Sequence, residues 1–165
     1  MPYDATIKTE AQYAESLGIN ATEDKFHATY NGILTHWFPT SHGYVIDHQV
    51  MGEGGKPEYL IVRHAGGKRN PVLIVELKRP NKWTNAGKKE VQDDLKVYIE
   101  GRFDLTQYNT IYGVGGIGLH WSVYKMEKSG NHELHVVQDW KDNIASDTSY
   151  TEFLHVADLV HKLAV

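Results

Sequence analysis

Apolar residues recur at helical spacing in four stretches of the chain. Thr22 can cap a helix that runs to about Trp37. The same spacing predicts a helix over 86–103 and an amphipathic helix over 151–164, and residues 10–17 form a shorter candidate. The longer helices each carry an apolar face, so we expect them to pack against a common core.

Between these helices lie shorter runs that are typical of β-strands; 59–64 and 71–77 are mainly apolar, and 119–126 alternates between apolar and polar residues. The predicted strands cover 44–51, 59–64, 71–77, 109–114, 119–126 and 133–139. Their order predicts a mixed β-sheet of about four to six strands flanked by helices, an α/β or α+β arrangement. We expect residues 1–165 to form a single domain, with a core at about 22–126 and a strand and helix at 133–164 packed on it.

A glycine-rich segment, residues 113–118, formally matches G-x-G-x-x-G. A dinucleotide site needs this motif between a strand and a helix. Residues 119–126 alternate like a strand instead, so we interpret the glycines as a tight turn and expect no NAD binding.

The composition narrows the class of protein. Hydrophobic residues make up 41% and charged residues 23%, as in ordinary globular proteins. The absence of cysteine excludes disulfides, thiolate zinc sites and cysteine nucleophiles. No apolar run approaches the roughly 20 residues that span a membrane, and the polar first residues do not resemble a signal peptide. We therefore expect an intracellular protein, cytoplasmic or nuclear, without a membrane partner.

Positive charge is concentrated in one part of the sequence. The net charge of the whole chain is −4. Residues 56–102 hold 11 basic and 6 acidic residues, a net charge of +5, whereas the rest of the chain carries −9. Such a segment suits a phosphate-binding surface, although chance clustering on solvated strand ends and a helix gives the same pattern.

Ionisable side chains stand where two predicted strands begin and end. Glu58 opens one strand, and Glu76, Leu77 and Lys78 end the next. Because side chains alternate along a strand, Glu76 and Lys78 point to one side and Leu77 to the other. A hairpin would bring Glu58 near Glu76. Charges beside a buried sheet are costly unless they are paired or hold a metal, so these residues are either a strand-end ion pair or a candidate site.

This pattern resembles the PD-(D/E)XK nuclease superfamily, which has the restriction-endonuclease-like fold. Pro57-Glu58 corresponds to the PD element, and Glu76-Leu77-Lys78 corresponds to (D/E)XK. The resemblance covers roughly residues 22–126 and departs from the usual motif at Glu58, where Asp is commoner.

The resemblance implies a nuclease that uses Mg²⁺ or Mn²⁺ to hydrolyse phosphodiester bonds. Glu58, Glu76 and the backbone carbonyl of Leu77 would hold the metal, which neutralises charge and acidifies its bound water. Lys78 would be catalytic: it would orient or deprotonate the attacking water, or offset charge on the phosphate. Burial and a nearby metal are expected to lower the pKa of Lys78.

Other residues have roles that the sequence leaves open. The resemblance suggests Glu23 as an additional metal ligand, although an acid in a first helical turn is also favoured by the helix dipole. Gln92, an auxiliary residue, either contacts the site or lies on a solvated helix face. His27 or His36 is another candidate ligand. We interpret Asp47 as an outward-facing or paired residue, with a metal ligand on its strand as the alternative.

The expected partner is nucleic acid, with DNA favoured over RNA because most of the superfamily cuts DNA. Trp83 either stacks on a base or packs at the sheet edge. The alternatives are a non-catalytic module that binds nucleic acid or protein, and a small-ligand or structural domain; a homodimer stays open. The candidate phosphate contacts are Arg63, Lys68, Arg69, Arg79, Lys82, Lys88, Lys89 and Lys96.

Overall fold

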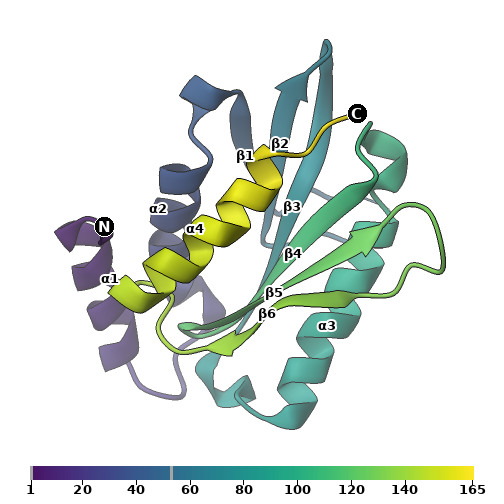
Figure 1. Ribbon diagram of the computed structural model, residues 1–165. Helices are drawn as coiled ribbons and strands as arrows, with labels where there is room; N and C mark the ends of the chain where they lie inside the picture. The colour runs from purple at the N-terminus through teal and green to yellow at the C-terminus, as the bar shows by residue number, and fades with distance from the viewer. Residues whose placement is uncertain (1, 53) are drawn as a thin grey trace.

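The computed structural model describes residues 2–52 and 54–165 (Figure 1). Its helices are α1 (Ala5–Ser16), α2 (His27–Trp37), α3 (Asn85–Glu100) and α4 (Asp147–His161). Short 3-10 helices cover Glu23–Phe26 (η1), Thr40–His42 (η2), Pro80–Lys82 (η3) and Phe103–Leu105 (η4). The strands are β1 (Tyr44–His48), β2 (Tyr59–Ala65), β3 (Lys68–Lys78), β4 (Thr110–Ile117), β5 (His120–Glu127) and β6 (His135–Lys141).

Six strands of the described chain form one sheet in the order β1-β2-β3-β4-β5-β6. Strands β3 and β4 are parallel, and the other neighbouring pairs are antiparallel. Helix α3 makes the crossover between β3 and β4. The carboxyl ends of β3 and β4 therefore meet at one edge of the sheet, where open α/β sheets bind ligands.

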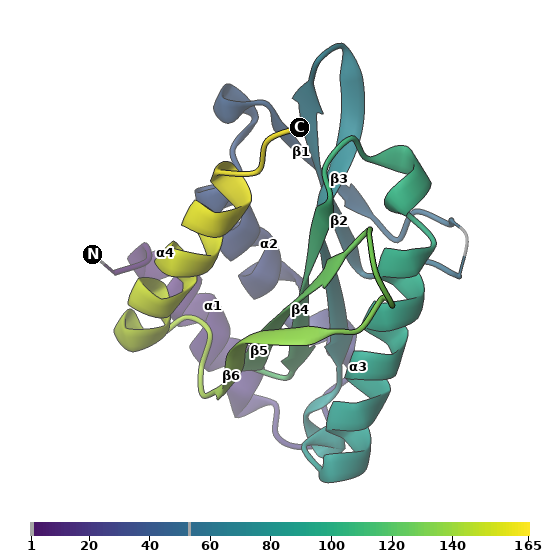
Figure 2. The ribbon, with the colours of Figure 1, turned by 45° about the vertical axis from the view of Figure 1, so that its right-hand side comes forward.

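Helices cover both faces of the sheet (Figures 1 and 2). Helices α1, α2 and α4 lie on one face, and α3 lies on the other. Strand β3 separates two cores: Leu73, Val75 and Leu77 belong to the core under α1, α2 and α4, and Ile74 belongs to the core under α3. The same alternation turns Glu76 toward α3.

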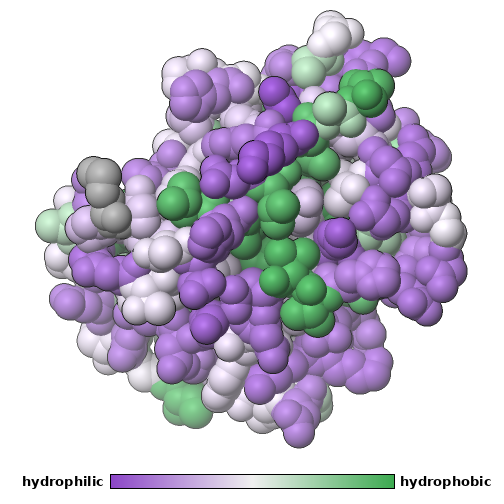
Figure 3. Space-filling view, in the orientation of Figure 1, coloured by the Kyte–Doolittle hydropathy of each residue, from purple (hydrophilic) through white to green (hydrophobic). Residues whose placement is uncertain are grey.

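On the face that carries α4, a band of hydrophobic residues runs beside this helix over the strands (Figure 3). Exposed apolar side chains on that part of the chain include Val136 of β6 and Leu154 and Leu159 of α4. No helix within 2–52 and 54–165 has the length and apolar character needed to cross a membrane.

The predicted mixed sheet with flanking helices is confirmed. Three helix starts differ from the sequence-based expectation, and one of these helices is α4, which begins at Asp147 and not at residue 151. Helix α1 begins at Ala5, well before residue 10. The helix expected from Thr22 begins with the 3-10 helix η1, and α2 starts at His27.

The prediction of a turn over residues 113–118 is wrong. Residues up to Ile117 belong to β4, and Gly118, with a φ of 57°, lies in the turn that leads to β5. The reason is packing: a side chain at Gly115 would overlap Val91 of α3, and one at Gly113 would press on Leu95. Glycine in a strand thus marks the close approach of a helix.

Candidate functional site

Glu76 is a carboxylate inside the protein, near the carboxyl end of β3. Its side chain faces α3 and is 5% exposed. The ammonium nitrogen of Lys78 lies 3.5 Å from Glu76 Oε2 and 2.8 Å from Asp94 Oδ2, which α3 supplies. These three side chains form one group, which we call the carboxylate–lysine cluster (Glu76, Lys78 and Asp94).

Burial raises the pKa of Glu76 to about 8, because a buried carboxylate loses its hydration. A hydrogen bond with Asp94 raises this pKa as well, whereas the charge of Lys78 lowers it. At neutral pH the Glu76 carboxyl therefore holds a proton and donates it in the hydrogen bond to Asp94. Sharing one proton avoids a buried negative charge on Glu76 next to the partly exposed carboxylate of Asp94.

Lys78 is more strongly held as a cation than the sequence led us to expect. Its partial burial lowers the pKa, but the hydrogen bond to Asp94 and the charges of Glu76 and Asp94 outweigh burial, so the pKa lies above its usual value. The expected lowering of the Lys78 pKa is therefore wrong, because Asp94 was not foreseen. Tyr98 is affected by the same charges. Its burial, and to a smaller extent the charge of Glu76, raise its pKa to about 12.

Glu58 lies in a bend just before β2. The last paired residues of β2 and β3 at this end are Tyr59 and Val75, so Glu58 lies one residue beyond the ladder. The charge of Glu58 contributes to raising the pKa of Glu76. The two acids thus lie near the same end of the sheet, and the expected convergence of their carboxylates stays a prediction.

The carboxylate of Glu58 lines an open polar pocket of about 320 Å³. Glu58 Oε2 accepts a hydrogen bond of 3.0 Å from Gln49 Nε2 and lies 3.0 Å from His27 Nε2. Glu23 and Arg79 line the same pocket, which brings Glu23 into the neighbourhood of Glu58. The buried Nε atom of Arg79 has no hydrogen-bond partner among the described residues.

Leu77 and Gln92 differ in their relation to the cluster. Leu77 pairs with Gly116 of β4 and buries its side chain on the opposite face, so its backbone separates Glu76 from Lys78. Gln92 donates a hydrogen bond of 3.3 Å to the hydroxyl of Tyr124 on β5. Residues two apart on a helix point about 200° apart, so Gln92 turns toward β5 and Asp94 toward β3.

Five of the predicted phosphate contacts follow β3 in the chain. Arg79 lines the polar pocket, Lys82 pairs with Glu90 at 3.4 Å, and Lys89 pairs with Asp93 at 2.7 Å. Lys88 lies over the ring of Trp83, 4.1 Å from its centre, and Lys96 is exposed on α3. This group begins at the same sheet edge as the cluster and continues along α3.

The other three predicted contacts lie at the opposite end of β3. Lys68 and Arg69 begin this strand of 11 residues, whose length at about 3.3 Å per residue puts them roughly 25 Å from Glu76. Arg69 pairs with Asp47 at 2.7 Å, and Arg63 donates to the backbone carbonyl of Leu163 at 3.3 Å. The predicted basic surface is therefore divided between two ends of the sheet, and the paired state expected for Asp47 is confirmed.

Asp94 is the residue of this site that the sequence reasoning missed. It directly precedes Leu95, which belongs to the core under α3. An acid at the border of an apolar helix face, on the helix that follows the E-x-K strand, is the signal that was available. His27, considered as a possible ligand, contacts Glu58 instead of lying in the cluster.

The donor chemistry of this region fits a Mg²⁺-type ion. Mg²⁺ prefers oxygen ligands and is usually held by one or two carboxylates and several waters. Glu76 and Asp94 supply two carboxyl groups within hydrogen-bond contact, and Glu58 is near enough for its charge to raise the pKa of Glu76. Over residues 2–52 and 54–165, no group of three or more His, Cys, Asp or Glu side chains is arranged to hold a metal. The fit is thus to a carboxylate pair and not to a complete protein cage.

The fold is restriction-endonuclease-like. It is similar to the type IIG restriction endonuclease BpuSI, with a TM-score of 0.59 and 12% sequence identity, over 87% of this chain and 17% of the BpuSI chain. A chain of the cryo-EM structure of a DrdV–DNA complex is similar over 94% of this chain and 93% of its own, with a TM-score of 0.57 and 12% identity. No protein-family model matches the sequence, and neither does any curated protein. At this identity the likeness establishes the fold.

Proposed function

We propose that this protein is a divalent-metal-dependent nuclease of the PD-(D/E)XK type, with Glu58 and Glu76 as metal ligands and Lys78 as a catalytic residue. One observation carries the proposal. Glu76 is a buried carboxyl group at the carboxyl end of a parallel strand, held against Lys78 and Asp94. Perturbed ionisable groups gathered at such an edge are typical of functional sites.

A bound Mg²⁺ or Mn²⁺ would neutralise phosphate charge and make water a better nucleophile. Glu76 and Glu58 would hold it, with the carbonyl of Leu77 and Glu23 as further candidates. To bind a metal, Glu76 must first release the proton that it shares with Asp94. Metal affinity is therefore expected to rise with pH up to about 8, the pKa of Glu76.

Lys78 suits an electrostatic role better than that of a base. Its raised pKa keeps it positively charged at neutral pH, when it can hydrogen-bond a phosphate oxygen and balance charge that develops in the transition state. Asp94 holds the ammonium at 2.8 Å and so fixes its direction. We therefore assign Asp94 as a positioning residue in this scheme, while Gln92 stays an auxiliary candidate.

DNA is the proposed substrate class. One of the two structural neighbours was determined as a DNA complex, and basic residues begin where β3 ends and continue along α3. These residues would contact backbone phosphates without reading sequence. Homodimerisation stays a prediction.

A non-catalytic DNA-binding module is the second candidate. A specific observation favours it: the carboxylate–lysine cluster neutralises itself, because Glu76 shares a proton with Asp94 and Lys78 pairs with both. Such a cluster can persist without a metal. Binding that is unaffected by chelator, in the absence of cleavage, would distinguish this candidate from a nuclease.

Cleavage of labelled single-stranded DNA and plasmid DNA with Mn²⁺ tests the proposal. The wild type should cut, EDTA should abolish cutting, and Glu76→Gln should reduce the rate by about 10²-fold or more. Asp47→Asn is a matched control, since it removes a carboxyl from a separate, partly exposed ion pair with Arg69, and Asp47 lies on the edge strand β1, two strands away from Glu76. Unfolding curves of both variants show that the fold is retained.

The proposal fails if the folded wild type does not cut any of these substrates with Mg²⁺ or Mn²⁺. It also fails if Glu76→Gln cuts as fast as Asp47→Asn. In either case, metal-independent DNA binding by the wild type would identify the binding module.

A further inference from the structure

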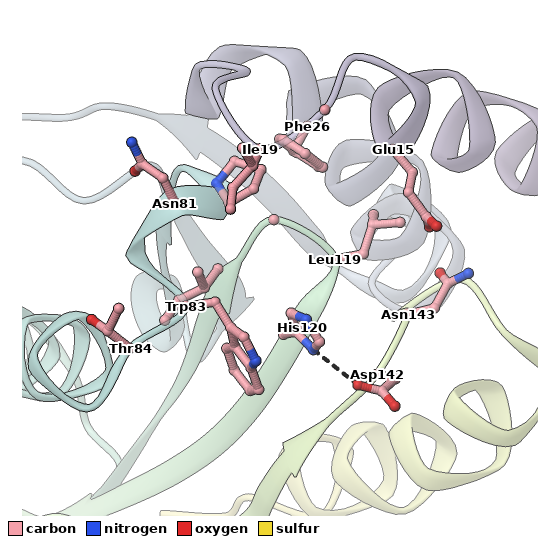
Figure 4. Close-up of a pocket in the computed structure, with 14 residues that line it drawn as sticks. Glu15, Ile19, Phe26, Asn81, Trp83, Thr84, Leu119, His120, Asp142 and Asn143 are labelled. Carbon is pink, nitrogen blue, oxygen red and sulfur yellow. Dashed lines mark ion pairs between the residues drawn. The ribbon is translucent and has the colours of Figure 1, made fainter.

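A larger, mainly apolar pocket lies at the same sheet edge (Figure 4). Its volume is about 660 Å³, within the range of sites for small organic ligands. Ile19, Phe26 and Leu119 form apolar walls, and Trp83 and His120 lie across from Ile19 and Phe26. The pocket therefore has the shape and lining for a flat, weakly polar group.

The wall formed by Trp83 and His120 is fixed in place. Their rings stack at a centroid distance of 3.7 Å and an angle of 6°. Lys88 lies over the Trp83 ring at 4.1 Å, and Trp140 meets it edge-on at 5.4 Å. A wall held by these contacts loses little conformational entropy when a ligand binds beside it.

The charges near the pocket differ in sign between its lining and its surroundings. Glu15 and Asp142 line the pocket, with Asp142 Oδ1 3.0 Å from His120 Nδ1. Lys88, which lies over Trp83, and Lys82, which directly precedes Trp83, are outside this lining. A phosphate would therefore lie outside the pocket, beside these lysines, while the group inside the pocket is uncharged.

The pocket adjoins the backbone that carries the carboxylate–lysine cluster. Pro80 and Asn81, two and three residues after Lys78, line it. Gly118, also part of its lining, donates its backbone N–H to the carbonyl of Lys78 at 3.0 Å. A nucleotide in the pocket would thus lie next to the strand end that carries Glu76.

We propose that this pocket, the base pocket, holds an unstacked nucleobase of single-stranded nucleic acid, with the adjoining phosphate near Lys82 and Lys88. This inference rests on the proposed function and adds a substrate preference to it. Apolar walls beside a stacked aromatic pair suit the faces of a base, and the amides of Asn81 and Asn143 suit its polar edge. An apolar peptide would match the walls but would bring no phosphate to Lys82 and Lys88.

Binding assays without metal test the base pocket independently of cleavage. Fluorescence anisotropy in EDTA compares a short labelled DNA strand with a strand of equal length made of abasic units, which has the same phosphates and no bases. The wild type should bind the base-containing strand about tenfold more tightly, the range expected for stacking of a base.

Two charge-adding variants locate the effect. Ile19, which lines the pocket, is 66% exposed, and Leu17, which does not, is 40% exposed, so both tolerate substitution. Ile19→Glu should weaken binding of the base-containing strand by about tenfold, and of the abasic strand by less than about twofold. Leu17→Glu adds the same charge nearby and should weaken both strands equally and slightly.

Equal wild-type affinity for the two strands would overturn the base pocket, and so would equal losses in the two variants. A parallel cleavage assay with Mn²⁺ separates the two proposals. Base-dependent binding without cleavage refutes the nuclease and leaves the base pocket standing. Cleavage without any base dependence of affinity refutes the base pocket and leaves the nuclease.

Discussion

The two ends of strand β3 carry similar side chains in different surroundings. At the hairpin end, Lys68 and Arg69 are exposed, and Arg69 pairs with Asp47 in contact with solvent. At the carboxyl end, Glu76 is buried, has a raised pKa and shares a proton with Asp94. Water screens the charges at the hairpin end, so these charges contribute little to stability. The second set is desolvated, and this difference, not the number of charges, identifies the candidate site.

The largest expected effect is on catalysis, and it should be confined to one end of the strand. Lys78→Met removes the cation that we propose to balance phosphate charge, and we expect the rate of Mn²⁺-dependent cleavage to fall by about 10²-fold or more. Lys68→Met, the same change at the other end of β3, should leave the rate within about twofold. Initial rates on a labelled strand measure both, and comparable rates for the two variants would remove Lys78 from the mechanism.

The next effect is on stability and depends on pH. Folding raises the pKa of Glu76 from 4.5 to about 8. Between these values the unfolded chain has lost this proton and the native protein has kept it, so this group lowers the free energy of unfolding as pH rises. Glu76→Gln removes that term.

We therefore expect Glu76→Gln to gain stability relative to the wild type as pH rises from 4.5 to about 8. The expected gain is on the order of 3 kcal/mol. Urea unfolding at a series of pH values measures it. Asp47→Asn should change the free energy of unfolding by less than about 1 kcal/mol, because its ion pair with Arg69 is partly exposed. A flat difference for Glu76→Gln would mean that Glu76 is ionised at neutral pH.

A smaller effect concerns the partner of Glu76. Asp94→Asn removes the charge that helps to keep Glu76 protonated, so the pH-dependent step should move below about 8. Asp93→Asn, one residue away and paired with Lys89, should leave the step unchanged. Titration of the glutamate carboxyl carbons by NMR follows the step directly. An equal shift in both variants would indicate a long-range effect of net charge.

The smallest effect is on the salt dependence of DNA binding. Lys82→Ala should reduce the slope of log K against log salt by about 0.7 for single-stranded DNA if Lys82 contacts one phosphate. Lys68→Ala should leave the slope unchanged. Anisotropy titrations at several salt concentrations provide both slopes, and a loss in Lys68→Ala would extend the interface to the hairpin end.

Much of the fold was predictable because apolar patterning along β2, β3 and α3 is regular. The antiparallel pairing of β2 with β3, which puts Glu58 and Glu76 near the same end of the sheet, also followed, since a hairpin register is set by its turn and its apolar residues. The strand over residues 113–117 was not recognised, because its glycines are needed for packing against α3, and that contact lies far away in sequence.

The remainder of the site depends on tertiary geometry. Asp94 contacts Lys78 because α3 is rotated so that Asp94 is directed toward β3. The apolar pattern of α3 defines this rotation only to within a turn of the helix. Arg63 was expected to contact phosphate, but it donates to the carbonyl of Leu163 near the end of the chain. Contacts between segments so distant in sequence cannot be predicted from the local sequence pattern of either segment.

The glycines of β4 have an effect on the chemistry of β3. With hydrogen atoms in place of side chains, Gly113 and Gly115 let Leu95 and Val91 settle directly on the sheet. The distance between α3 and the sheet in turn determines how close Asp94 lies to Glu76 and Lys78. A single methyl group at Gly115 would lift the helix and loosen the proton-sharing contact, so the acidity of Glu76 can be tuned from another strand without changing any ionisable residue.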